Sequence, residues 1–151
     1  MKYFEDVKVG ESYESRAVAV TEEDIVDFAT QFDPQPFHTE PSAAKDTMFG
    51  DLVASGWHTA ALCHRLSLEI LNEAGWGAGI GRGIEELKWI DPLYVGDTLR
   101  IEYEIVDKSR DSSPDAYGNI RSRISGYNQH DECIITYRGN GMLQCRNSNV
   151  G

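Results

Sequence analysis

The sequence is short of cysteine, of basic residues and of long apolar runs, and each shortage argues against a class of protein. Its three cysteines are an odd number without a CxxC pair, so reduced thiols in the cytoplasm are the simplest interpretation. No apolar run is long enough to cross a bilayer, and the N-terminal MKYFEDVKVGE has no apolar core of a signal peptide. These absences predict a cytoplasmic protein with no membrane partner.

Basic residues are outnumbered, with 14 Lys and Arg against 25 Asp and Glu, which gives a net charge of −11. Nucleic acid is therefore not an expected partner, because proteins that bind it must neutralise phosphates. An anionic ligand would need a local cluster of Arg or Lys. The length of 151 residues and the 40% hydrophobic content fit one globular domain with an ordinary core.

The first half of the chain predicts helices. Thr21 opens an N-cap signature, and apolar residues then recur at helical spacing up to Phe32. This helix is expected to end at Asp33, because proline disfavours helical conformation in the residue before it. A helical turn is predicted at residues 41–45. A longer helix is predicted at residues 57–74, with apolar residues around much of its circumference, which is typical of a helix buried in the domain.

The second half predicts antiparallel strands. The alternating glycines of residues 75–83 are expected to form a flexible connection. Strands follow at residues 84–90, 99–106, 120–128 and 133–145, where apolar residues recur with the strand period of two. Helices followed by consecutive strands predict an α+β fold. The domain is expected to occupy residues 1–146, with 147–151 as a disordered tail.

The loop after the first helix carries an acid and an imidazole. Asp33 and His38 are five residues apart, in a stretch that Pro34 and Pro36 stiffen. On one rigid loop they could share a proton transfer, and Phe37 could supply an apolar wall that shifts both pKa values. Taken alone, such a motif is more often a helix-ending Asp, a turn and a solvent-facing His.

The start of the long helix offers a second element. Backbone amides there lack intrahelical partners, and the helix dipole favours negative charge. Gly56 has no side chain to block a ligand oxygen, so its amide is a candidate oxyanion donor. The alternative is structural: Ser55 caps the helix, and Gly56 permits close packing.

Several segments together resemble one family. FDPQPFHTEPSAA is similar to the active-site loop of the MaoC-like acyl dehydratases and R-specific enoyl-CoA hydratases, and FGDLVASGWHTAAL resembles the segment that follows it in a bacterial subgroup. IEELKWIDPLYVGDTLRIEYEIVDK and GYNQHDECIITYRGNGML resemble the strands of that subgroup. The similarity covers nearly the whole chain in one order.

The resemblance implies a single hot-dog domain, in which an antiparallel sheet wraps a long central helix, assembled as a homodimer or higher homo-oligomer. It implies that Asp33 and His38 are the catalytic pair that activates water, and that the Gly56 amide binds the thioester carbonyl. Around them, Gln35, Phe37, Ser55 and Trp57 are expected to bind the substrate. Gln35 and Phe37 replace the family's Asn and aliphatic residue, which leaves the acyl chain open.

The expected function is a hydro-lyase that hydrates a 2-enoyl-CoA or dehydrates a 3-hydroxyacyl-CoA. No metal is expected, and no cofactor apart from the coenzyme A that the substrate carries. His64 stands where some hydratases have a hydroxyl-bearing residue, and it is not assigned a catalytic role. Two alternatives remain: a hot-dog thioesterase, although Glu69 is the only acid well inside the helix, and a non-catalytic acyl-thioester-binding protein.

Overall fold

The computed structural model describes residues 1–111 and 113–146, so the predicted tail at 147–151 lies outside the described residues. Four helices come first or lie in the first half of the chain: α1 (Glu22–Phe32), α2 (Pro36–Thr39), α3 (Pro41–Ala44) and α4 (Gly56–Glu73), preceded by a 3-10 turn at Phe4–Asp6. The strands are β1 (Ser12–Glu14), β2 (Val18–Ala19), β3 (Gly79–Trp89), β4 (Thr98–Ser109), β5 (Tyr117–Tyr127) and β6 (Cys133–Gln144).

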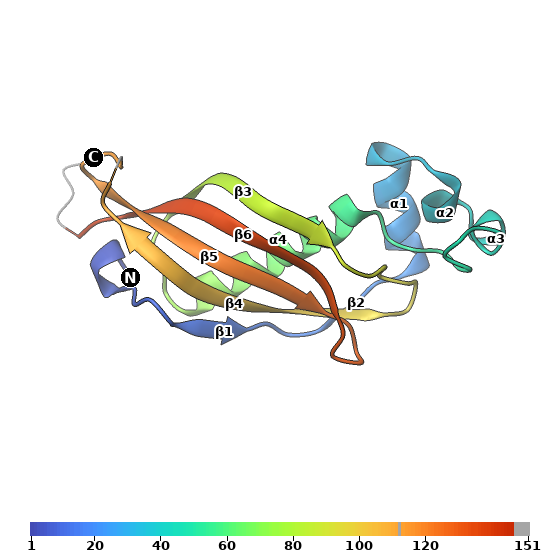
Figure 1. Cartoon of the computed structure of the whole chain (residues 1–151), viewed down its shortest axis with the longest axis horizontal. Coiled ribbons are helices and arrows are strands. Elements are labelled where there is room, and N and C mark those ends of the chain that lie inside the picture. Colours follow the sequence, from blue (N-terminus) through green and yellow to red (C-terminus); the bar gives the residue numbers. More distant parts are fainter. Residues whose placement is uncertain (112, 147–151) are drawn as a thin grey trace.

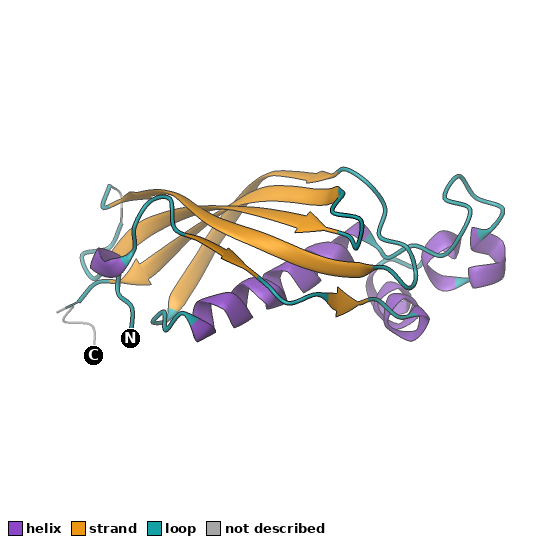
Figure 2. Cartoon of the chain, turned by 90° about the horizontal axis from the view of Figure 1, so that it is seen from below, coloured by secondary structure: helices purple, strands orange, loops and turns teal. Residues whose placement is uncertain are grey.

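The strands form one antiparallel sheet in the order β1-β4-β5-β6-β3, with β2 also paired to β4. The long helix α4 lies along one face of this sheet (Figures 1 and 2). The core fills the space between them, where Leu66 of α4 is buried with Ile101 of β4 and Ile135 of β6. A long helix held in a curved antiparallel sheet is the hot-dog fold, so the predicted fold class is confirmed.

Helices α1, α2 and α3 form a separate group at one end of the sheet (Figure 1). The Thr21 hydroxyl accepts a hydrogen bond from the Asp24 amide, which caps α1, and α1 ends before Asp33 as predicted. The loop after it contains the additional helix α2, with Pro36 at its start. Proline suits that position because its missing N–H has no intrahelical partner there.

Two sequence predictions were wrong in detail. The glycine run does not stay a connection, because β3 begins at Gly79 and pairs with β6 from there onward. The helix α4 is buried on one face only: Cys63 and Leu66 are buried, whereas Trp57 and Leu68 are 59% and 52% exposed. The apolar residues that extend around much of the circumference of α4 therefore do not all pack in the core of this chain.

Strand β3 contains a bulge between Glu85 and Lys88, where Glu86 has a positive φ of 55°. Cross-strand partners point to the same face of a sheet. Ile84 pairs with Gly139 and Trp89 with Ile135, so both point to the face that α4 covers, although they are five positions apart. In a regular strand an odd spacing would put them on opposite faces. The extra residue in the bulge thus directs Trp89 toward α4.

Candidate active site

Asp33 and His38 come together at the start of α4. The Asp33 Oδ2 atom lies 3.4 Å from His38 Nε2, and both side chains are largely shielded from solvent. Asp33 follows the last residue of α1, and His38 belongs to α2, so the short helix turns the imidazole back toward the carboxylate. The alternative interpretation of the loop required a solvent-facing His38. His38 is instead buried.

Two side chains donate to the Asp33 carboxylate. The Gln35 amide donates to Oδ1 at 2.6 Å, and the Ser55 hydroxyl donates to Oδ2 at 2.7 Å. Partial burial raises the pKa of Asp33, but the two hydrogen bonds and the nearby His38 outweigh it, so that the pKa lies below its ordinary value. Asp33 is thus an ionised carboxylate at neutral pH.

The orientation of His38 follows from a backbone contact. Its Nδ1 atom lies 2.7 Å from the Val53 carbonyl oxygen, which can only accept a hydrogen bond. Nδ1 therefore carries a proton, and in the neutral ring Nε2 is the unprotonated nitrogen. Because Nε2 faces Asp33, this nitrogen is available to take up a proton beside a negative charge.

Gly56 is the first residue of α4, and Ser55 caps the helix by accepting from the Trp57 amide at 3.3 Å. In residues 1–111 and 113–146 no hydrogen bond uses the Gly56 amide, which leaves this donor open. Gly56 also packs closely against Trp89: the indole Nε1 donates to the Gly56 carbonyl at 2.8 Å, and a Cβ at Gly56 would lie 2.6 Å from the ring. The structural explanation of this glycine is therefore correct, and the oxyanion role stays a prediction.

The other predicted substrate contacts are spread around this centre. Phe37 packs edge-on against His38, with ring centroids 4.5 Å apart, and also contacts Phe49. Trp57 is exposed and packs edge-on against Trp89 at 5.1 Å. Ser55, in contrast, is completely buried. Phe37 and Trp57 thus flank the site, whereas Ser55 can reach only Asp33 and the helix start.

The sequence placed His58 near the start of the long helix without giving it a role, and it did not connect Trp89 with this region. Trp89 is 33 positions from Gly56, and the bulge that directs it toward α4 has no clear sequence signal. His58 is buried, and its ring stacks on Phe28 at 4.7 Å. Burial lowers the pKa of His58, against a smaller opposite effect of Asp24. No hydrogen bond from the described residues reaches its Nδ1 atom.

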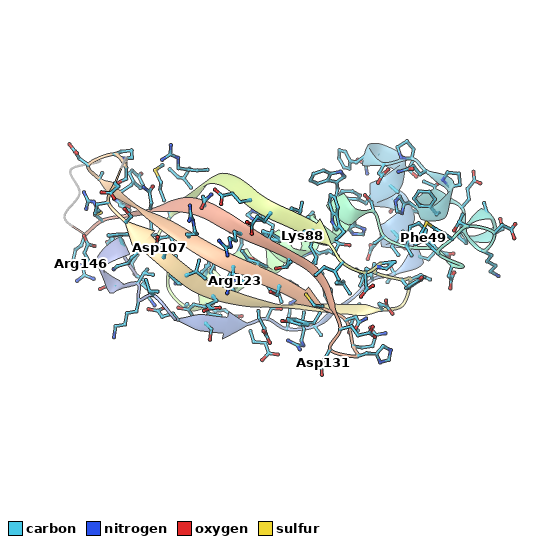
Figure 3. All side chains as sticks on the ribbon, viewed as in Figure 1. Phe49, Lys88, Asp107, Arg123, Asp131 and Arg146 are labelled. Atoms are coloured by element: carbon cyan, nitrogen blue, oxygen red, sulfur yellow. The ribbon has the colours of Figure 1, made fainter. Side chains whose placement is uncertain are left out.

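Glu69 is paired elsewhere on the surface, and Arg123 lies away from this site (Figure 3). Glu69, which a thioesterase would need, is held by Arg16 at 3.0 Å on the surface. Arg123 lies over the middle of the sheet, away from the end that carries Phe49 (Figure 3). Within the part of the chain that the structure describes, no group of three His, Cys, Asp or Glu side chains could hold a metal ion, and no helix there is long and apolar enough to cross a membrane.

Comparisons with known proteins identify the family. The family model "MaoC like domain" matches residues 5–120. The chain belongs to the MaoC-like domain family. A crystal structure of the MaoC-like dehydratase from Rhodospirillum rubrum is similar to this MaoC-like chain, with a TM-score of 0.86, 32% identity, and 98% of this chain and 100% of that chain covered.

Two curated relatives are also similar to this MaoC-like protein. Uncharacterized protein YdeM of Bacillus subtilis is 30% identical over 129 residues, which are 84% of this chain and 88% of YdeM. The 3-hydroxyacyl-thioester dehydratase Z of Mycobacterium tuberculosis is 31% identical over 100 residues, which are 66% of this chain and 64% of that protein. The relatives of this MaoC-like chain thus include dehydratases.

Proposed function

We propose that the protein is a hydro-lyase that reversibly adds water to a 2-enoyl-CoA thioester, or removes water from a 3-hydroxyacyl-CoA thioester. One observation carries the proposal. An ionised carboxylate and an imidazole lie 3.4 Å apart, and Ser55, the residue next to Gly56, binds that carboxylate. The acid, the base and a helix start with an open amide therefore converge on one place, which is the set of groups that hydration of a thioester requires.

In the proposed reaction Asp33 and His38 hold and activate a water molecule. The water oxygen bonds to Cβ, and the electron pair of the double bond moves toward the thioester oxygen as an enolate. The Gly56 amide and the dipole of α4 stabilise this negative charge. A proton then adds to Cα. Phe37 and Trp57 supply apolar walls beside the reacting atoms.

The relatives support the reaction class. The Mycobacterium tuberculosis relative is named a 3-hydroxyacyl-thioester dehydratase, and the Rhodospirillum rubrum protein a MaoC-like dehydratase. Coenzyme A enters our proposal as the carrier of the acyl group, with no separate cofactor. The three cysteines are free thiols, which suits a reducing compartment, and we keep the cytoplasm as the proposed location.

We also propose a homodimer in which β3 meets its counterpart. Strand β3 is the long edge strand of the sheet, and an unpaired edge favours pairing with another chain. The apolar side chains of Ile84 and Leu68 are exposed there, on β3 and α4. In a dimer with its two-fold axis beside β3, the second chain would cover both Ile84 and Leu68.

The first test measures turnover. The purified protein is expected to change the absorbance of enoyl thioesters in a panel of short, branched, dicarboxylic and aromatic enoyl-CoAs. Asp33→Asn and His38→Ala should each lower kcat by roughly a hundredfold or more, with unchanged thermal unfolding. Asp27→Asn, which removes an exposed acid from α1, serves as the matched control and should keep wild-type rates.

The outcome separates the proposal from its alternatives. Release of free thiol without hydration would indicate a thioesterase. Thermal stabilisation by acyl-CoA with no turnover across the panel would indicate a binding protein. Near-wild-type rates in both the Asp33→Asn and His38→Ala variants would overturn the assigned roles.

A further inference from the structure

Gln35 and Ser55 both donate hydrogen bonds to the Asp33 carboxylate. Each oxygen of the carboxylate accepts from one of them, at 2.6 Å from the Gln35 amide and 2.7 Å from the Ser55 hydroxyl. Ser55 is 0% exposed, so its hydroxyl could reach a substrate only after leaving Asp33. The same hydroxyl accepts from the Trp57 amide at 3.3 Å, which fixes its direction.

His38 has only one nitrogen free for chemistry. Nδ1 is committed to the Val53 carbonyl at 2.7 Å, whereas Nε2 faces Asp33 at 3.4 Å. In the neutral ring, Nε2 and the carboxylate are both acceptors. They can therefore be bridged by a water molecule that donates to each, or they form an ion pair after Nε2 takes up a proton.

We infer that Gln35 and Ser55 are positioning residues that keep Asp33 as an oriented, ionised carboxylate. The proton taken from water then passes to His38 Nε2 and not to Asp33. This inference rests on the proposed function and changes the sequence-based assignment, in which both residues bind substrate. Among the described residues, His38 is the only basic side chain within ion-pair distance of the Asp33 carboxylate, so no other ionisable side chain replaces the two neutral donors.

The step then balances with Asp33 unchanged. One O–H bond of the water breaks, its proton passes to Nε2, and the water oxygen bonds to Cβ. The electron pair of the carbon–carbon double bond moves to the enolate. The Nε2–H bond then breaks, and its electron pair stays on Nε2. The proton bonds to Cα through the π electron pair of the enolate carbon–carbon bond, and an electron pair on the enolate oxygen restores the thioester carbonyl. Asp33 accepts a hydrogen bond from the water and pairs with the imidazolium between the two transfers.

Variants of both donors test the inference. Gln35→Leu keeps the size of the side chain and removes the donor, while Ser55→Ala removes the donor together with the helix cap. The Asp33 carboxyl is titrated by carbon NMR in each variant, and its pKa is expected to be higher than in the wild type. We expect kcat to fall roughly tenfold with little change in KM, because one charge-assisted hydrogen bond is lost.

Controls separate positioning from folding. Gln31→Leu removes an exposed amide from α1 and should change neither the titration nor kcat. Ser55→Thr and Gln35→Asn keep the donors and should restore most of the rate. If Gln35→Leu and Ser55→Ala leave the Asp33 titration unchanged, the inference is overturned, as it is if they mainly raise KM. Because the titration needs no turnover, it decides the inference even if the wild type hydrates no enoyl-CoA.

Discussion

At the scale of single residues, His58 shows how burial can outweigh the effect of a nearby charge on a pKa. It stacks almost parallel on Phe28, with an angle of 8° between the rings. Burial lowers its pKa, and Asp24 offsets only part of this effect. The imidazole is therefore neutral in the folded protein at a pH where the unfolded chain, with a pKa of 6.5 for His, already takes up a proton.

This difference predicts a pH dependence of stability. The unfolded state binds more protons than the folded state below pH 6.5, so the free energy of unfolding should fall as the pH is lowered from 6.5 toward the folded pKa. His58→Phe keeps a ring on Phe28 and removes the titration. Urea unfolding at several pH values should show a weaker decline for this variant. His130→Phe, an exposed imidazole, is the control, and an equal decline in His58→Phe and the wild type would contradict the explanation.

The sequence predicted a contact between residues on one loop and missed contacts between residues that are far apart in the sequence. The spacing of Asp33 and His38 on one stiffened loop indicated that they could meet, and the structure brings them together. The bond from Ser55 to Asp33 joins residues 22 positions apart, and Val53 orients His38 through a main-chain carbonyl. Neither contact can be predicted from the residue types, because both depend on how α2 packs beside the start of α4.

At the scale of elements, the contact between β3 and α4 decides which residue can stand at the helix start. Trp89 donates to the Gly56 carbonyl, and the Cβ of any larger residue at position 56 would lie 2.6 Å from its ring. Gly56 is thus required by the neighbouring strand, whatever role its amide has toward a ligand.

We expect Gly56→Ala to destabilise the protein by about 1–3 kcal/mol, because the new methyl group overpacks against the indole. In a Trp89→Ala background the same change should be close to neutral, since alanine has the higher helix propensity. A double-mutant cycle by urea unfolding measures this coupling. Equal costs of Gly56→Ala in both backgrounds would show that the contact with Trp89 is not the reason.

Element boundaries were predictable where local chemistry sets them. Thr21 caps the start of α1, Pro34 follows its end, and Ser55 caps the start of α4, all as the sequence indicated. The start of β3 was missed because glycine has a low strand propensity. Its glycines are held by pairing with β6, a long-range interaction that overrides local preference.

At the scale of the whole molecule, one edge of the sheet differs from the other. The edge at β1 is short, whereas β3 is 11 residues long and mostly exposed. The sequence predicted a buried helix with apolar residues around much of its circumference, and the second copy in the proposed homodimer would bury the side of α4 that remains open here. Resemblance to a family implied that partner, whereas the hydrophobic pattern alone could not say which protein covers the exposed face.

The proposed homodimer should depend on this face. Leu68→Glu places a charge on the open side of α4, and we expect it to convert a dimer into a monomer at micromolar concentration, because burying an unpaired charge is costly. Sedimentation equilibrium measures the mass. Val9→Glu introduces the same charge at another exposed apolar position and should leave the dimer intact. A monomeric wild-type protein would contradict the proposed assembly.

The position of α1, α2 and α3 beyond the end of the sheet has a consequence for inactivation. The bonds that orient the candidate site also fasten this segment: His38 to the Val53 carbonyl, Val53 to the Phe37 carbonyl, and Ser55 to Asp33. A segment at one end of a fold can open locally at a lower free energy than the whole fold. Release of this segment would dismantle the site while the sheet and α4 stay folded, so the temperature of half-inactivation can lie well below the melting temperature.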